Sequence, residues 1–497
     1  MATLFLDGFA AIFSNPINLL IIFGGVSVGI IFGALPGLTT VAALSMFLPI
    51  TFGMDMQIGL SMLTGIFIGG TSGGLIPAIL LNIPGTPASI ATTFDGRPMA
   101  LNGQAGKALG VAIISSFMGT LISIIALIFI APPLAALTIR FGPWENFAVT
   151  VFALTLISSL VGKSLVKGLL AAFLGLMLST VGFAPIDGAS RYTFGNIQLT
   201  AGFELLPVLV GLYAISEVIS NAAGGKGKNT SIVSDFKIRG LGFKFAEIKS
   251  QIGNFFRSAF IGLGIGVLPG IGGATANLIA YSVAKNASKH PDKFGTGIID
   301  GVVAPEASNN ATIGGAMVPL LTLGIPGDGS TALLLGGFML HGVTPGPLLF
   351  QTHGAAVYTI FASMIVSSFL MMTLMYAGMR GFVKILKVPS YILLPVVVVL
   401  CVIGAFVVGF RTFDVWSLLA FGVIGLAMQK FGVPIPPLIL GFILGAPLET
   451  NLRQGLQHSQ GNFLDAFTRP IVVVFFALII LFFAGTAIQK KIRSKKA

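Results

Sequence analysis

Long apolar runs fill most of the chain, and many have the length that crosses about 30 Å of hydrocarbon. We predict eleven crossings, five in the first half of the chain and six in the second: 59–94 (interrupted), 108–131, 146–160, 165–183 and 205–222, then 298–338 (interrupted), 355–378, 390–409, 415–428, 433–450 and 470–488. Two more apolar stretches, 16–48 and 256–284, are long for one crossing and short for two, and each has a Pro-Gly in its middle. We expect both to be re-entrant hairpins, which enter and leave the membrane on the same side.

The sequence of the first half, 1–222, is repeated in the second half, 256–470. GALPGLTTVAAL from Gly33 resembles GVLPGIGGATANL from Gly266, and TSGGLIPAILLNIPGTP from Thr71 resembles IGGAMVPLLTLGIPGDG from Ile313. Each half thus has one hairpin and one helix interrupted at Ile-Pro-Gly. Proline and glycine unwind a helix, and unwound backbone at membrane depth is tolerated only where protein or a wet cavity satisfies it. The breaks are therefore predicted to line a cavity.

Composition supports an all-α polytopic membrane protein. Hydrophobic residues make up 55% of the 497 residues and charged residues only 9%, whereas soluble chains carry about 25% charge. The low charge excludes a soluble enzyme and a nucleic-acid-binding protein. Cys401 stands alone and the four histidines lack metal spacing. Without a nucleophile elbow or a phosphate-binding loop, we expect no enzymatic activity and no cofactor other than Na⁺ or H⁺ as coupling ion.

Basic residues predict the orientation in the membrane, because they mark its cytoplasmic side. With the N-terminus outside the cell membrane, the predicted crossings place 23 of the 28 Lys and Arg residues in the cytoplasm, including the linker 223–255 and the tail of 471–497 after the final transmembrane helix. Arg257 and Lys285 flank the second hairpin, and no basic residue flanks the first. The two halves therefore face opposite ways. Secondary transporters have such inverted repeats and bind substrate near the midplane at broken helices.

Small polar residues and glycines at the hairpin tips and breaks are the candidate site. As substrate-binding residues we propose Pro36, Gly37, Thr39, Thr40, Thr71, Ser72, Gly73, Asn82, Gly85, Thr86, Gly270, Gly272, Gly273, Thr275, Asn309, Asn310, Gly327, Ser330 and Thr331. For cation coupling we propose Glu306, Ser308, Asn310, Thr312 and Asp328, with a possible Na⁺ at Thr40, Asn310 and Asp328. Acids within a crossing are costly and usually functional. The alternative for Asp328 is a structural helix cap, and for Glu306 a solvated position at the inner interface.

Four long runs are similar to a known family. GALPGLTT (33–40), the segment 69–100, GVLPGIGGATANLIAYSVAKNASKHPDKFGTG (266–297) and the segment 304–342 resemble the large membrane subunit of tripartite tricarboxylate transporters, the TctA type. The resemblance implies a bacterial inner membrane location, a small four-helix membrane subunit and a periplasmic substrate-binding protein as partners. It also implies uptake of citrate or another small carboxylate by symport with a cation.

The mechanism expected from this resemblance is a secondary transporter. By analogy with other hairpin-containing transporters, the hairpins and broken helices would move together as an elevator. The alternative is an anion-selective channel or pore built from the paired broken helices.

Overall fold

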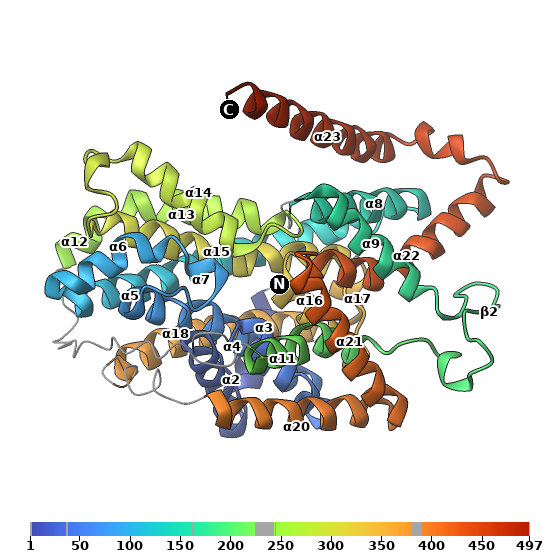
Figure 1. Ribbon diagram of the computed structural model, residues 1–497, viewed down its shortest axis with the longest axis horizontal. Helices are drawn as coiled ribbons and strands as arrows, with labels where there is room; N and C mark the ends of the chain where they lie inside the picture. Colours follow the sequence, from blue (N-terminus) through green and yellow to red (C-terminus); the bar gives the residue numbers. More distant parts are fainter. Residues whose placement is uncertain are drawn as a thin grey trace. The chain divides into compact units, whose positions relative to one another are not determined.

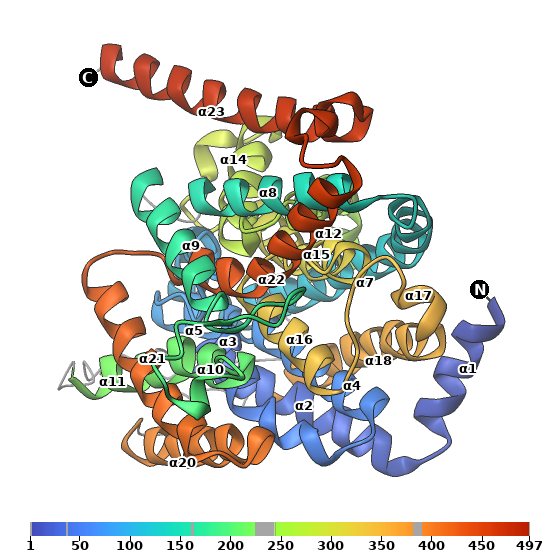
Figure 2. The same ribbon diagram turned by 90° about the vertical axis from the view of Figure 1, so that its right-hand side faces the viewer.

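The computed structural model describes residues 2–35, 38–160, 164–223, 243, 245–379, 381 and 390–496, and these are mostly helical (Figures 1 and 2). Six helices of this part are long and apolar enough to cross a membrane: Pro16–Ala34, Met56–Leu81, Thr92–Thr138, Gly354–Gly378, Thr412–Lys430 and Ile435–His458. Eight shorter apolar helices accompany them. The predicted all-α polytopic membrane protein is therefore confirmed. The count of eleven crossings and the re-entrant geometry of the hairpins stay predictions.

The chain folds into two compact units, each built from two stretches. Unit 1 comprises Met1–Ala135 and Leu209–Leu426, and unit 2 comprises Ala136–Val208 and Ala427–Ala497. Each unit therefore takes residues from both halves of the sequence. Most of the predicted linker 223–255 lies outside the described residues, as do Pro36 and Gly37 of the first hairpin.

Unit 1 contains both candidate hairpins and both interrupted helices. From the first half of the chain it contains α1 (Ala2–Phe13), α2 (Pro16–Ala34), α3 (Thr40–Phe47), η1 (Pro49–Gly53), α4 (Met56–Gly73), α5 (Leu75–Leu81), η2 (Pro87–Ser89), α6 (Thr92–Met99), η3 (Ala100–Gln104) and most of α7 (Ala105–Thr138). After α10 (Leu205–Val210), which ends at the boundary, come η5 (Gly211–Ile215), α11 (Ser216–Ala223), α12 (Phe245–Ser250), α13 (Ile252–Val267), α14 (Gly272–Ala287), η6 (Pro291–Lys293), α15 (Asp300–Leu323), α16 (Gly329–Leu340), α17 (Leu349–Thr352), α18 (Gly354–Gly378), α20 (Ser390–Gly409) and most of α21 (Thr412–Lys430).

The close packing of helices in the first half of unit 1 recurs at equivalent positions in its second half. α2 packs along α4, and α13 packs along α15 (Figures 1 and 2). A Cβ on Gly73 would lie 2.6 Å from the backbone oxygen of Ile30, and a Cβ on Gly315 would lie 2.6 Å from that of Leu263. Gly315 is the repeat equivalent of Gly73, as Leu263 is of Ile30. Small residues let helix backbones approach closely in membrane proteins, and both repeats use them at the same place.

The breaks after α5 and α15 also have the same local structure. Asn82 and Gly324, which are equivalent, end these helices in the left-handed conformation with φ of 59° and 70°. Glycine adopts this conformation without strain and asparagine tolerates it better than most residues. Ser89 Oγ accepts a hydrogen bond from the Thr86 N–H, and Thr331 Oγ1 accepts the equivalent bond from the Asp328 N–H. Each break therefore leads into a new helical turn that is held by a hydroxyl three residues later.

A buried carboxylate connects the two halves of unit 1 beside α6. Asp95 Oδ1 accepts hydrogen bonds from the backbone N–H groups of Gly295, Gly297 and Ile298 at 2.8–3.0 Å. Its Oδ2 accepts a bond of 2.9 Å from Tyr281 Oη. The loop between α14 and α15 is thus held to α6, which precedes the long helix α7.

Unit 2 is built around α22 (Ile435–His458), which packs against α8 (Pro143–Leu160) and α9 (Leu165–Ser179). Its other elements are β1 (Gly182–Phe183), β2 (Ser190–Arg191), η4 (Ile197–Leu199), η7 (Phe463–Thr468) and α23 (Pro470–Lys496). β1 and β2 pair antiparallel in the connection after α9. The side chain of Trp144 is fully buried and lies in a cluster with Phe147 and Ala466.

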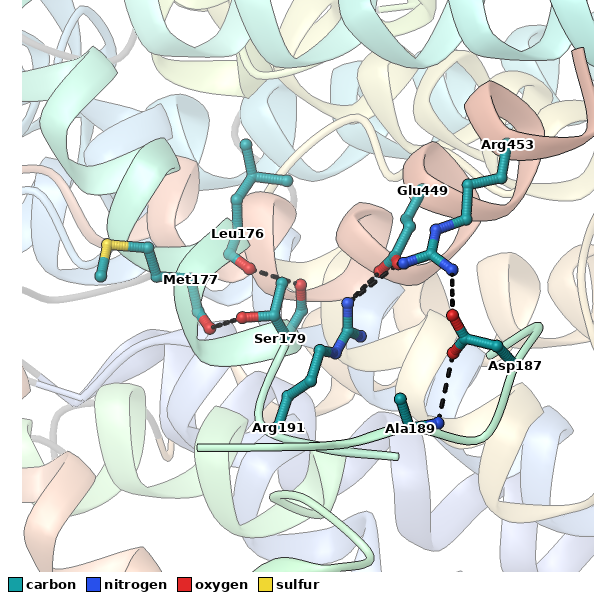
Figure 3. A network of polar contacts seen from close by, with 9 residues as sticks. Leu176, Met177, Ser179, Asp187, Ala189, Arg191, Glu449 and Arg453 are labelled. Atoms are coloured by element: carbon teal, nitrogen blue, oxygen red, sulfur yellow. Dashed lines mark hydrogen bonds and ion pairs between the residues drawn. The ribbon is translucent and has the colours of Figure 1, made fainter. Parts of the chain in front are cut away.

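Ion pairs hold the β1–β2 connection on α22 (Figure 3). Arg191 Nη1 lies 2.9 and 3.0 Å from the two carboxylate oxygens of Glu449. Arg453 contacts Glu449 at 2.9 Å and Asp187 at 2.7 Å. The hydrogen bond from Arg453 lowers the pKa of Asp187 below its ordinary value. Two arginines and two acids thus fix a loop that has little hydrophobic core of its own.

Candidate functional site

The tip of the second hairpin is pinned to the break that follows α15. Gly270 and Gly272 take positive φ angles of 80° and 65° between α13 and α14, which lets the chain turn tightly. The Gly270 N–H donates a hydrogen bond of 2.7 Å to the Gly327 oxygen. The hairpin tip and the helix break of this repeat therefore form one local structure.

The first repeat reaches the same place through η2. A Cβ on Gly273, in the first turn of α14, would lie 2.5 Å from Asn309 Oδ1 and 3.0 Å from Ala88 Cβ. Residues from α14, α15 and η2 therefore converge on one point. The candidate site at the hairpin tips and breaks stays a prediction, and unit 1 brings Gly273 of the second hairpin together with Asn309 of α15 and Ala88 of η2.

Buried polar groups without partners gather on these elements. Asn309 is 0% exposed, and within the described residues neither its Oδ1 nor its Nδ2 has a hydrogen-bond partner. The hydroxyls of Ser308 and Thr86 are also buried and unpartnered within this part of the chain. Leaving a buried polar group unsatisfied costs about 1–3 kcal/mol. Such groups are uncommon in native proteins and call for a physical reason, and a polar ligand is one that would repay the cost.

Three helices begin around this point, and they differ in how their first turns are capped. Thr39 caps α3 by accepting a hydrogen bond from the Ala42 N–H. Asp328 caps α16, since its Oδ1 accepts bonds of 2.8 Å from both the N–H and the hydroxyl of Thr331. No side chain among the described residues caps α14. Free N–H groups and the helix dipole make such a terminus attractive to anions.

The contacts of Asp328 match the structural alternative stated for it. Its carboxylate lies at the start of α16, where negative charge is favourable, and the aliphatic Cβ lies 3.5 Å from the position of a Cβ on Gly272. The acid therefore caps α16 at the edge of the site. The other two proposed Na⁺ ligands, Thr40 and Asn310, have neighbours that differ from those of Asp328. Thr40 packs beside Gly70, and Asn310 belongs to a network along α7.

That network joins α15 to α7 through three successive turns. Ser116 Oγ donates to Glu306 Oε2 at 2.9 Å, and Thr120 Oγ1 lies 3.4 Å from Asn310 Oδ1. One turn further, Ser123 Oγ accepts from the Gly314 N–H at 3.2 Å. Helices α6 and α4 add one hydroxyl each: Thr92 donates to Glu306 Oε1 at 2.5 Å and Ser72 donates to Asn310 Oδ1 at 2.7 Å. Glu306 is 0% exposed.

Several predicted site residues serve packing or lie at the margin. Gly73 and Gly327 pack against backbone, and Gly85 lies against Gly74 and Pro77. The hydroxyl of Thr312 donates to the backbone oxygen of Asn309. Asn82 and Thr275 are exposed, whereas Thr71, Ser330 and Thr331 are buried. Within the described ranges there is no group of three His, Cys, Asp or Glu residues that could hold a metal ion.

Sequence reasoning missed two residues of η5 and α11, one near the first hairpin tip and one near the start of α16. Thr39 Oγ1 donates to Glu217 Oε2 at 3.3 Å. Tyr213 Oη has no hydrogen-bond partner among the described atoms and would lie 2.8 Å from a Cβ on Gly329. Glu217 lies inside the predicted crossing 205–222, so the rule that marked Glu306 would also have marked Glu217. No sequence signal marked Tyr213.

A family model and two relatives match the chain. The model of the tripartite tricarboxylate transporter TctA family matches residues 19–440, a range that includes the tips of both hairpins and both breaks. The chain belongs to the TctA family. This membership makes it a multi-pass membrane component of a transporter that works with further subunits.

Two relatives are known from Agrobacterium vitis. The chain is 36% identical over 482 residues to an uncharacterized 52.8 kDa protein in the TAR-I ttuC' 3' region, covering 97% of this chain and 95% of the relative. It is 38% identical over 236 residues to an uncharacterized protein in the TAR-II ttuC' 3' region, covering 47% of this chain and 96% of the relative. No solved structure matches the chain.

Proposed function

We propose that this chain is the large transmembrane subunit of a binding-protein-dependent secondary transporter. It imports citrate-like tricarboxylates or other small carboxylates together with Na⁺ or H⁺. Its partners are a small four-helix membrane subunit and a periplasmic substrate-binding protein. It lies in a bacterial inner membrane, with a periplasmic N-terminus and a cytoplasmic C-terminus.

One observation carries the proposal: the uncapped first turn of α14 lies against the unpartnered amide of Asn309. A carboxylate can accept hydrogen bonds from backbone N–H groups at a helix N-terminus and from the Nδ2 of an asparagine. Thr86 Oγ1, also unpartnered, supplies a further donor from the first repeat. Donors from both repeats would suit a substrate with more than one carboxylate.

Electrostatics requires that several cations accompany such a substrate. Moving one charge through 100 mV changes the free energy by about 2.3 kcal/mol, so a trianion entering an inside-negative cell faces roughly 7 kcal/mol. Three cations cancel this term and a fourth reverses it. Symport is therefore the mode we propose, with the hairpins and interrupted helices of unit 1 moving as an elevator.

The experiment is uptake of radiolabelled citrate by proteoliposomes containing the full chain and its partner subunits. We expect Asn309→Ala to weaken citrate uptake at least tenfold, and Asn451→Ala, which changes an amide of unit 2, to leave it unchanged. Labelled citrate should also exchange against unlabelled citrate inside the vesicles, because a carrier shows counterflow and a pore does not. Unchanged uptake by the Asn309 variant, or transport without counterflow, would overturn the proposal.

A further inference from the structure

Glu306 is a buried acid whose carboxyl group contacts hydroxyls and no basic side chain in the described part of the chain. Thr92 Oγ1 lies 2.5 Å from one of its oxygens and Ser116 Oγ lies 2.9 Å from the other. The residue is 0% exposed. An ionised carboxylate in such surroundings is very costly unless it is paired, and a buried acid usually neutralises instead.

α15 and the elements around it carry charged residues besides Glu306. They are Asp55 at the start of α4, Asp95 and Arg97 in α6, Lys107 in α7, Arg257 in α13, Lys285 in α14, Asp300 in α15 itself and Asp328 at the start of α16. Lys107 pairs with Glu247 at 2.6 Å, and Arg257 donates to Asn254 Oδ1 at 2.8 Å. Asp95 binds the α14–α15 loop. In the described part of the chain the hydrogen bonds to the Glu306 carboxyl group come from Thr92 and Ser116 and not from these charged groups.

Hydroxyl partners suit both protonation states of a carboxyl group, whereas a lysine or arginine stabilises only the anion. A hydroxyl can donate to a carboxylate, and it can turn and accept from a protonated carboxyl. Ser116 has an acceptor for its own proton in that second state, because serine hydroxyls on a helix bond to the carbonyl four residues earlier. Its neighbours on α7 do so: Ser115 donates to the Val111 oxygen at 2.7 Å and Thr120 to the Ser116 oxygen at 2.8 Å.

Glu306 is also connected to the candidate substrate site through α15. Asn309 follows it by three residues, and side chains three apart are neighbours on a helix surface. Asn310 Nδ2 donates to the Glu306 backbone oxygen at 3.1 Å, and Asn310 Oδ1 accepts from Ser72 of α4. The turn that carries Glu306 is therefore held in place against α4, α6 and α7.

We propose that Glu306 is a proton-binding site of the transport cycle, an inference that rests on the proposed function. A proton from water forms an O–H bond with a Glu306 carboxylate oxygen on one side of the membrane. That bond breaks on the other side and the proton returns to water, so the step involves no oxidation or reduction. The proton moves in the same cycle as the substrate. It therefore supplies one of the positive charges that compensate the negative charge of the substrate.

The test separates exchange from accumulation in proteoliposomes with radiolabelled citrate. Glu306→Gln keeps the neutral form permanently, so counterflow should stay within about twofold of wild type. Accumulation driven by a pH gradient should fall at least tenfold. Ser115→Ala, which removes a neighbouring buried hydroxyl that does not contact Glu306, is the matched control and should retain both activities.

Each outcome decides the assignment. Accumulation by Glu306→Gln that responds to a pH gradient as wild type does would overturn it, as would loss of counterflow together with accumulation in a folded variant. If the glutamine variant does not fold, Glu306→Asp should shift the pH profile of accumulation, and an unshifted profile would refute the site. Absence of counterflow in the wild-type protein would instead refute the proposed function.

Discussion

The closeness of α13 to α15 yields a quantitative prediction about Gly266. A Cβ at this position would lie 2.9 Å from the Thr312 oxygen and 3.0 Å from the Cα atoms of Thr312 and Gly315. All three are backbone atoms, which cannot turn away as the end of a side chain can. Gly264, two residues earlier on the same helix, would place a Cβ with nothing within 4 Å. Substitution with alanine at the two positions therefore differs in packing and in little else.

The magnitude follows from these distances. Carbon atoms in good contact are about 3.5–4.0 Å apart, so Gly266→Ala must separate the two helices by several tenths of an ångström. Overpacking of this kind costs about 1–3 kcal/mol. Replacing glycine by alanine in a helix gains up to about 1 kcal/mol, and this gain is common to both variants. We expect Gly266→Ala to be less stable than Gly264→Ala by about 1–3 kcal/mol.

The assay is the free energy of unfolding of each variant, from denaturant titration of the purified chain in mixed micelles. Gly33→Ala tests the first repeat, because a Cβ there would lie 3.1 Å from the Gly73 Cα. Its control is Gly24→Ala, whose Cβ would meet nothing within 4 Å. The same order of stabilities should appear in both pairs. If Gly266→Ala were as stable as Gly264→Ala, the close approach of the helices would be wrong.

Four further predictions concern acids with defined partners. Asp328→Ala should lower the free energy of unfolding by about 1 kcal/mol through loss of the α16 cap, and Asp328→Asn should lower it by less. Loss of citrate uptake in a stable Asp328→Asn variant would show that the acid does more than cap the helix. Asp95→Ala leaves three backbone N–H groups without their acceptor, so it should destabilise unit 1 by about 3 kcal/mol or more and speed proteolysis at residues 288–299; an unchanged unfolding curve would contradict this. Glu449→Gln removes the charge that two arginines share, so protease cleavage between residues 184 and 200 should become faster than in wild type. In the wild-type protein the ion pair of Asp187 stabilises this loop at pH values above the ordinary pKa of 3.8, and this stabilisation is lost only as pH falls through the lowered pKa of Asp187. Protease cleavage of the same loop should therefore stay slow when the pH is lowered through 3.8.

Much of the architecture could be read from local sequence patterns. The apolar runs predicted a polytopic helical protein because the hydrophobic effect acts on every residue independently of its distant neighbours. The paired Ile-Pro-Gly motifs predicted where helices are interrupted, since proline and glycine act on their own backbone. The equivalent conformations of Asn82 and Gly324 show how closely the two repeats agree at atomic detail.

The partners of the polar residues could not be read in this way. Thr92 and Ser116 contact Glu306 from positions about 200 residues away in the chain, and nothing in their own segments distinguishes them from other hydroxyls. Glu217 reaches Thr39 of the first hairpin and Tyr213 reaches Gly329 of α16 only because η5 and α11 fold against these segments. Asp328 was identified from its sequence context, but only the position at which the α16 backbone begins shows that its carboxylate caps this helix.

Asn309 and Asn310 show which features the sequence alone determines and which depend on the tertiary structure. The sequence determines that two asparagines stand side by side in an apolar helix, and that their burial is costly without partners. Only the tertiary structure separates them: Asn310 contacts Ser72, Thr120 and the Glu306 backbone, while the Asn309 amide faces the first turn of α14 with no partner among the described residues. Successive residues of a helix point about 100° apart, so adjacent identical residues meet different neighbours, and those neighbours are supplied by distant parts of the chain.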